Sequence, residues 1–319
     1  MRITTLAGGV GAAKMLRGIA AAFPTDHVTA LVNVADDERL HGLAISPDLD
    51  TVVYTLAEAI DPERGWGLAG ESWTAMASVR RYSDHTGRDD IGWFQLGDRD
   101  LGTHMFRTTR LAEGSPLSEV TAEICGAWGV TVEVIPVSDD RVATRVSTVD
   151  HGDLAFQDYF VRLHHDVAAT DIAFDGAADA RPAPGVIEAI GSADVVVIAP
   201  SNPIVSIGPV LAVPGIADAV RARRANTVAV SPIIGGKALK GPADRLLAEL
   251  GHEVSVVGVA RIYADLASVL VIDEVDRGLA DAVEATGVRC VVAPTIMSDR
   301  ERAADLARVV VSAGSSGLL

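Results

Sequence analysis

The chain has 319 residues, with 27 Lys and Arg against 43 Asp and Glu, and a net charge of -16 at pH 7. This acidic balance disfavours nucleic acid and anionic membrane as partners, because both would be repelled. Hydrophobic residues make up 49% of the chain and no apolar run reaches the length of a membrane span, so we expect a sizeable core and a cytoplasmic protein.

The N-terminal segment predicts a βαβ unit built around a glycine turn. An apolar run over residues 3–7 predicts a buried strand, followed by Gly8, Gly9 and Gly11, a helix over residues 12–23 and a second strand over residues 27–33. Small residues at such a turn let backbone N–H groups approach an anion. The spacing is neither the dinucleotide fingerprint nor a Walker loop, so an ordinary tight turn stays an alternative.

The segment after the second strand is mostly helical. Pro47 ends an extended stretch and a helix begins near Asp50, with apolar residues recurring on one face. Residues 61–129 carry no strand signal, and we interpret them as a helical insertion or cap. Within it, one helix opens at residues 97–104 and runs to about residue 111, and Ser115 and Pro116 begin another.

Strand patterns return from residue 130. The first is at residues 130–137, and alternating residues at 142–148 and 154–161 indicate a small antiparallel excursion, whereas residues 162–184 read as a loop. Strands at 194–199, 227–230, 254–259, 269–272 and 288–292 then alternate with helices at 214–224, 242–250 and 299–312, before a frayed tail at residues 314–319. We therefore predict one α/β domain over residues 1–319, a doubly wound, mostly parallel, Rossmann-like sheet with the helical insertion within it.

Polar, glycine-rich segments follow four of the predicted strands. They are residues 8–11, 33–37, 200–203 and 231–236. Ligands of open parallel sheets bind beyond the carboxyl ends of the strands, so these segments together predict a nucleotide-sized crevice. Each one taken singly is also an ordinary turn, since Gly, Pro, Ser and Asn are turn formers.

Two carboxylates lie near the glycine turn in the chain. Asp36 and Asp50 beside a phosphate predict a hard cation such as Mg2+ between them, with Asp37 and Asp48 as further candidate ligands. The competing interpretations are a helix N-cap for Asp50 and a solvated loop acid for Asp36. Both roles stay open from the residues alone.

The other polar residues are less specific. Arg99 could grip a polar ligand or pair with Asp98 or Asp100 on the surface. His104 lies one turn after Asp100, where a structural histidine is favoured over a catalytic base. His164 and His165 have no partner at metal spacing. Cys125 and Cys290 lie in apolar segments, which favours free thiols in a reducing compartment.

Taken in order, these motifs cover nearly the whole chain. They are Gly8-Gly-Val-Gly11, Asn33-Val-Ala-Asp-Asp37, Ile45-Ser-Pro-Asp-Leu-Asp-Thr51, Leu96-Gly-Asp-Arg-Asp100 with Thr103-His104, Pro200-Ser-Asn-Pro-Ile-Val-Ser-Ile-Gly-Pro209 and Ser231-Pro-Ile-Ile-Gly235. The set closely resembles the 2-phospho-L-lactate transferase and phosphoenolpyruvate transferase family of coenzyme F420 biosynthesis.

The resemblance implies a Mg2+-dependent transferase of substituted phosphate groups. Its substrates would be the deazaflavin Fo and a guanosine-diphosphate-linked three-carbon acid, and its products dehydro coenzyme F420-0 and GMP. His41-Gly42 and Asp61-Pro-Glu-Arg-Gly-Trp-Gly67 look like the actinobacterial branch, which favours phosphoenolpyruvate as the transferred group. A homodimer is also implied.

The resemblance also implies roles for individual residues. Asp36 and Asp50 would hold Mg2+ and act in catalysis. Fo would contact Asp50, Thr51, Arg99 and His104. The guanosine diphosphate would lie against Gly8, Gly9, Gly11, Asn33, Ser201, Asn202, Pro203, Ser206 and Ser231.

Three other functions compete with this one. The first is the same reaction with a lactyl donor. The two donor acids differ by one double bond, and no residue of the sequence distinguishes them. The second is a non-catalytic sugar-nucleotide-binding regulator of the related gluconeogenesis-factor family, disfavoured by the intact Ser-Pro-Asp-Leu-Asp-Thr block. The third is an NAD(P)-dependent oxidoreductase, disfavoured by the missing fingerprint.

Overall fold

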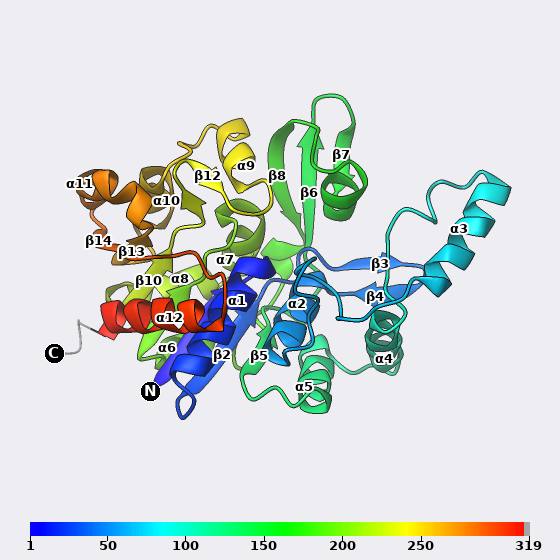
Figure 1. Ribbon diagram of the computed structural model, residues 1–319, viewed down its shortest axis with the longest axis horizontal. Helices are drawn as coiled ribbons and strands as arrows, with labels where there is room; N and C mark the ends of the chain where they lie inside the picture. Colours follow the sequence, from blue (N-terminus) through cyan, green and yellow to red (C-terminus); the bar gives the residue numbers. More distant parts are fainter. Residues whose placement is uncertain (316–319) are drawn as a thin grey trace.

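The computed structural model describes residues 1–315 and is organised by a seven-stranded parallel sheet (Figure 1). Its strands, in spatial order, are β14 (Arg289–Val292), β13 (Val269–Ile272), β10 (Thr227–Val230), β9 (Val195–Ile198), β1 (Arg2–Ala7), β2 (His27–Val32) and β5 (Glu133–Pro136). Most of these strands are buried along their length, which is why they read as apolar runs rather than as alternating ones. The predicted doubly wound α/β fold is confirmed.

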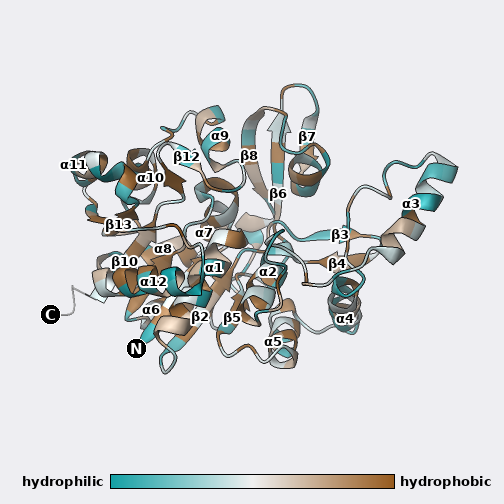
Figure 2. Ribbon diagram, in the orientation of Figure 1, coloured by the Kyte–Doolittle hydropathy of each residue, from teal (hydrophilic) through white to brown (hydrophobic). Residues whose placement is uncertain are grey.

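Helices cover both faces of the sheet. In Figure 1, α1 (Gly9–Ala22) and α12 (Arg300–Ser315) lie in front of the strands, and α6 (Val186–Ser192) and α8 (Ile216–Ala222) lie behind them. The α1 helix packs against both α12 and α2 (Pro47–Leu56). Figure 2 shows hydrophobic colour concentrated on the strands and the inner helices, as burial between two layers requires.

The remaining helices connect the strands. They are α3 (Thr74–Thr86), α4 (Asp100–Ala112), α5 (Leu117–Ala127), α7 (Gly208–Ala212), α9 (Ala243–Glu249), α10 (Val256–Tyr263) and α11 (Ala280–Glu284). Short 3-10 turns occupy Ala177–Asp179, Arg224–Asn226 and Glu274–Leu279, and π-helical turns occupy Asp158–Arg162 and Pro203–Ile207. Within residues 61–129, all described, the structure has α3, α4 and α5, and its nearest approach to a strand is an isolated bridge from Leu68 to Ile60.

Three small antiparallel sheets extend this framework. β6 (Ala143–Thr148) pairs with β7 (Gly152–Ala155) and β8 (Ala169–Asp175), β3 (Glu38–Leu40) pairs with β4 (Leu43–Ile45), and β11 (Ile233–Ile234) pairs with β12 (Lys237–Ala238). Figure 1 shows the β3–β4 hairpin and α3 projecting away from the central sheet, and the β6–β7–β8 sheet standing above it.

Several predicted elements differ from the structure. The predicted strand at residues 254–259 is wrong, because Ser255 caps a helix there, its hydroxyl accepting from the N–H groups of Val257 and Gly258 at 3.1 Å. A segment buried on all sides has no period that separates helix from strand. The predicted loop at 162–184 contains β8, and the predicted strand at 154–161 stops at Ala155 and turns into a π-helical segment. The β3–β4 hairpin was not predicted.

The last described residues are helical. Gly314 and Ser315 lie in α12, whereas the rest of the predicted frayed tail lies outside the described residues. Over residues 1–315, no single helix is long and apolar enough to cross a membrane, although the bent pair Pro203–Ala212 and Ile216–Ala222 passes on length and composition. Cys125 is buried, Cys290 is half-buried, and both are free thiols.

Candidate active site

A cavity of about 720 Å³ lies at the carboxyl edge of the sheet. Its wall includes segments that follow β1, β2, β9, β10 and β14, namely Gly8–Gly11, Asp36, Pro200–Asn202, Ser231–Pro232 and Thr295–Ser298. β1 and β9 are neighbours although the chain visits β2 and β5 between them, so the order of strands reverses at this point. Such a switch point is where open α/β sheets bind ligands, and the four predicted loops contribute to one crevice there.

The glycine turn after β1 is fixed by two steric requirements. Gly9 has φ +71°, a left-handed conformation that glycine adopts most easily. A Cβ added at Gly11 would lie 2.2 Å from the backbone oxygen of Pro200, so only glycine lets the turns after β1 and β9 approach so closely. Ser201 joins the same two turns, its hydroxyl donating to the Gly8 carbonyl at 2.7 Å.

Asp48 anchors the glycine turn by hydrogen bonding. Its carboxylate accepts the Gly9 N–H at 2.8 Å and the side-chain amide of Asn33 at 3.0 Å. Burial raises the pKa of Asp48 to about 6, although these two hydrogen bonds oppose the shift. The contact places an acidic group directly beneath the predicted phosphate cradle.

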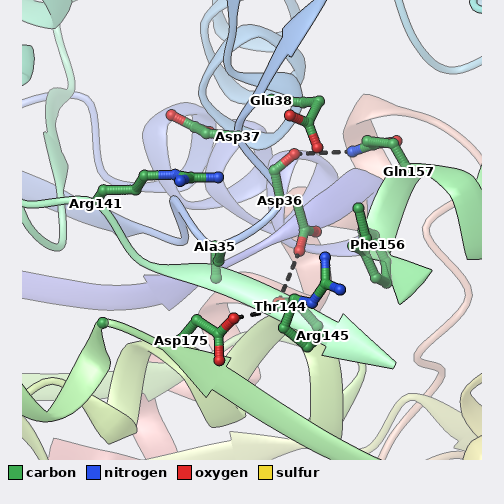
Figure 3. Close-up of a pocket in the computed structure, with 13 residues that line it drawn as sticks. Ala35, Asp36, Asp37, Glu38, Arg141, Thr144, Arg145, Phe156, Gln157 and Asp175 are labelled. Atoms are coloured by element: carbon green, nitrogen blue, oxygen red, sulfur yellow. Dashed lines mark hydrogen bonds and ion pairs between the residues drawn. The ribbon is translucent and has the colours of Figure 1, made fainter. Parts of the chain in front are cut away.

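Asp36 follows β2 and lies near Asp48, between the central sheet and the β6–β7–β8 sheet. Its backbone oxygen accepts from the Gln157 amide at 2.8 Å, and its carboxylate accepts from the Thr144 hydroxyl at 3.4 Å (Figure 3). Asp36, Phe156 and Gln157 also line a smaller cavity of about 330 Å³ on the far side, so they form a shared wall. Burial, followed by the nearby Asp48 and Asp37 carboxylates, raises the pKa of Asp36 well above its usual range.

Asp50 is the centre of a buried charge network. It lies in the first turn of α2, 5% exposed, where both carboxylate oxygens accept from the Arg107 guanidinium of α4. His104 contacts two carboxylates, with Nδ1 3.7 Å from Asp50 Oδ2 and Nε2 3.4 Å from Asp100 Oδ2. The Tyr54 hydroxyl also donates to Asp100, at 2.5 Å. Burial would raise the pKa of Asp100, but hydrogen bonds from His104 and Tyr54 with the charges of His104 and Arg107 hold it below its usual value.

Aromatic side chains form the remaining wall. Trp66, Trp93, Phe94, Phe156 and Phe160 line the cavity, in a chain that is only 4% aromatic. The Arg64 guanidinium lies over Trp66 at 5.4 Å from the ring centroid. A cavity with aromatic and polar walls in this volume range is suited to a planar organic ligand together with a polar one.

Most of the predicted site residues line this cavity. Those lining the cavity are Gly8, Gly9, Gly11, Asp36, Asp50, Thr51, His104, Ser201, Asn202, Ser206 and Ser231. Asn33 and Pro203 are buried behind the wall rather than on it. Arg99 is exposed and lies outside the cavity wall, where its side chain donates to the carbonyl of Ala69.

Two sets of side chains could hold a divalent cation. The first is Asp50, Asp100 and His104, whose ligand atoms lie within 4.8 Å of one another, with the buried His104 Nε2 3.4 Å from Asp100 Oδ2. The second is the Asp36 and Asp48 pair, since buried carboxylates with raised pKa values lack a counter-charge. Oxygen-rich sets of this kind suit a hard cation such as Mg2+.

Sequence reasoning missed Arg107, Tyr54, Lys14 and Lys240. Arg107 pairs with Asp50 across 57 residues of chain, and no local pattern in its helix marks it as buried. Tyr54 follows Asp50 by one helical turn, which places both on the side of α2 that meets α4. Lys14 and Lys240 line the cavity, and their separation in the chain hides their proximity.

Known proteins similar to this chain point to one family. A family model described as 2-phospho-L-lactate transferase CofD matches residues 3–312. A phosphoenolpyruvate transferase of Kitasatospora aureofaciens is 47% identical over 319 residues, covering 98% of this chain and 97% of that protein. Another, from Mycolicibacterium smegmatis, is 41% identical and covers 97% of both chains. A crystal structure of a upf0052 family protein from Bacillus halodurans shares the fold, with a TM-score of 0.63 at 17% identity over 97% of this chain and 98% of that one.

Proposed function

Because the chain belongs to the 2-phospho-L-lactate transferase family, we propose that it transfers phosphoenolpyruvate from enolpyruvyl-diphospho-guanosine to the deazaflavin Fo. The observation that carries this proposal is the full-length identity of 41% to 47% to relatives named phosphoenolpyruvate transferase. The cavity supports it independently, since its lining includes five aromatic side chains and a glycine turn.

The proposed reaction is a displacement at phosphorus. A ribityl hydroxyl oxygen of Fo attacks the phosphorus that bears the enolpyruvyl group, and the bond from this phosphorus to the oxygen bridging the two phosphates breaks. GMP leaves with that oxygen, dehydro coenzyme F420-0 forms, and the hydroxyl proton is released. This chemistry depends mostly on positioning and charge neutralisation.

We divide these tasks between the segments around the glycine turn and the aromatic side chains. We assign the donor to Gly8, Gly9 and Gly11 with the segment after β9, where backbone N–H groups and Ser201, Asn202 and Ser206 surround the space. Asn33 and Pro203 support this wall from behind, and Ser231 extends it. We assign Fo to the aromatic wall beside Asp50, Thr51 and His104. Arg99 would have to turn inward to join them, so its contact with Fo rests on the family resemblance.

Asp36 and Asp50 are the proposed holders of Mg2+, with Asp48 within the same acidic group. A bound Mg2+ would neutralise charge on the diphosphate and on the attacking oxygen. Arg107 leaves lone pairs on both Asp50 oxygens, because each carboxylate oxygen accepts more than one bond. The Arg107 pair fixes the orientation of Asp50 toward the cavity, and Asp50 could then orient the attacking hydroxyl.

Product formation from Fo tests this proposal. Purified protein with Fo, Mg2+ and the enolpyruvyl donor should yield GMP and dehydro coenzyme F420-0. Asp36→Asn and Asp50→Asn should each lower turnover by about 100-fold or more while the protein stays folded. Asp84→Asn, an exposed acid on α3, is the matched control with the same charge change. Near-normal turnover in the Asp50 variant would refute the catalytic role of Asp50.

Two alternatives are outcomes of the same assay. Faster turnover with the lactyl donor would assign the chain to the 2-phospho-L-lactate reaction. Tight binding of a UDP-sugar without any binding of Fo would favour a non-catalytic regulator. The resemblance further predicts a cytoplasmic homodimer. Sedimentation of the purified protein would test the oligomeric state.

A further inference from the structure

The lysines of this chain are used differently from its arginines. The sequence has three lysines, Lys14, Lys237 and Lys240, among 27 basic residues. Ion pairs in residues 1–315 use arginine, histidine or the N-terminal amine, as in the Arg107–Asp50, Arg110–Glu123 and Arg245–Glu249 pairs, and none uses lysine. Two of the three lysines line the large cavity, which suggests a role other than structural pairing.

Lys14 and Lys240 reach the cavity from separate segments. Lys14 lies in α1, one helical turn after Gly11, and Lys240 lies in the segment between β12 and α9. A Cβ added at Gly65 would lie 3.0 Å from Lys240 Nζ and 3.6 Å from a methyl carbon of Val10, so the Lys240 segment and the start of α1 meet at one turn. The two ammonium groups therefore stand on the same side of the cavity as the glycine turn.

These positive charges have no acidic partner in the part of the chain that the structure describes. Burial, then the neighbouring Lys240 and Arg17 charges, lowers the pKa of Lys14. Two cations that repel each other, in a chain of net charge -16, are stabilised when an anion lies between them. Asp48, the acid that contacts the glycine turn, is already bonded to the Gly9 N–H and the Asn33 amide.

The Asn202 side chain on the same wall also has a hydrogen-bond donor without a partner in the described chain. The Asn202 side-chain oxygen accepts from the N–H groups of Ile204 and Val205, at 2.9 and 3.4 Å, which fixes the amide orientation. Its Nδ2 is buried, and within residues 1–315 it has no hydrogen-bond partner. An unpaired buried donor is costly, so its place on the cavity wall indicates an acceptor atom of a ligand.

We propose that Lys14 and Lys240 clamp the diphosphate of a guanosine-linked donor above the glycine turn, with Asn202 donating to the same group. This inference rests on the proposed function and adds the residues that bind the charged part of the donor. Phosphate oxygens would accept from the two ammonium groups and from the free amide hydrogen, and the cations would offset the acidic chain. They are donor-binding residues, and the transfer step needs no proton from them.

Protection from chemical labelling tests the clamp without measuring activity. The three lysines are acetylated with an amine-reactive ester and quantified by mass spectrometry, with GDP, inorganic diphosphate or guanosine present. Saturating GDP and inorganic diphosphate should slow labelling of Lys14 and Lys240 by about 5-fold or more, and guanosine should not. Lys237, exposed and outside the cavity wall, is the internal control. Equal labelling of Lys14 and Lys240 with and without GDP would overturn the proposal.

Substitutions provide a second, independent readout. Lys14→Met and Lys240→Met keep the aliphatic stem and should each weaken GDP binding by about 10-fold or more, with Fo binding and thermal stability unchanged. Lys237→Met should bind GDP as the parent chain does. If the parent chain binds GDP and transfers the group while both variants bind GDP normally, only the clamp is wrong. If the parent chain binds neither GDP nor Fo, the proposed function fails, and the clamp with it.

Discussion

Replacing Arg107 by methionine should remove the counter-charge of Asp50 and leave a buried carboxylate. Arg107 is 1% exposed, donates to both Asp50 oxygens and also contacts the Ala44 carbonyl at 3.4 Å. Breaking a buried pair by removing one partner costs about 3 to 5 kcal/mol of unfolding free energy. For 319 residues an unfolding entropy near 0.7 kcal/mol/K follows from the average per residue, so the expected fall in Tm is about 4 to 8 °C.

Denaturant unfolding of four Mg2+-free proteins measures this coupling. They are the parent chain, Arg107→Met, Asp50→Asn and the double variant, which together form a double-mutant cycle. The double variant should be less destabilised than the sum of the single ones by about 2 kcal/mol or more, because it carries no unpaired charge. Arg110→Met is the control on the same helix, since its carboxylate partners are largely accessible to solvent and its loss should destabilise the protein far less than Arg107→Met does. An Arg107→Met cost as small as that of Arg110→Met would refute the reasoning.

Three further predictions follow from the site. Gly11→Ala should cost about 1 to 3 kcal/mol and weaken GDP binding, because its Cβ would meet the Pro200 oxygen, whereas Gly126→Ala in α5 meets nothing within 4 Å and should neither destabilise the protein nor change GDP binding. In Mg2+-free buffer the folded protein should gain stability as pH falls through about 6, the folded-state pKa of Asp48, because Asp48 and Asp36 have raised folded-state pKa values and take up protons that the unfolded chain does not. That contribution is lost as pH rises through the folded pKa values, and saturating Mg2+ should flatten the trend; an Asp48→Asn variant with the same slope as the parent would contradict it. Gln157→Ala should raise the Mg2+ concentration needed for half-maximal turnover by about 10-fold with little change at saturation, since Gln157 holds the Asp36 backbone at 2.8 Å, and an unchanged Mg2+ requirement would remove this positioning role.

The parallel sheet could be predicted from the sequence because burial on both faces imposes a simple pattern. The apolar runs that became β1, β2, β9, β10 and β13 are short and bounded by glycine, proline or polar turns. The same logic fails at α10, where Val256, Val257, Val259 and Ala260 are all buried. An apolar run in a helix packed on all sides looks like an apolar run in a central strand.

Elements away from the central sheet were harder to predict. β8 exposes Thr170, Asp171 and Asp175 and is held mainly by its pairing with β6, so its residues carry little hydrophobic signal. The three-residue strands β3 and β4 are too short to show a period. Their pairing depends on the turn at His41 and Gly42, both with positive φ.

The candidate site divides in the same way. Loops after strands are predictable because parallel topology brings their carboxyl ends to one edge, which is how Gly11, Asp36 and Ser201 reach one cavity. Partners supplied by tertiary packing are not predictable, and Arg107 and Lys240 are the clearest examples. The charge of -16 suggested that a diphosphate needs a metal, whereas the structure adds Lys14 and Lys240 as cations near the glycine turn.

The most direct test of the central claim is a mass spectrum of the product formed from Fo, Mg2+ and each guanosine-linked donor in turn. We predict dehydro coenzyme F420-0 and GMP from the enolpyruvyl donor, with turnover lost in Asp50→Asn. A product two hydrogens heavier, formed preferentially from the lactyl donor, would contradict the choice of phosphoenolpyruvate. No product from either donor, with no change in Fo fluorescence on mixing, would contradict the transferase itself.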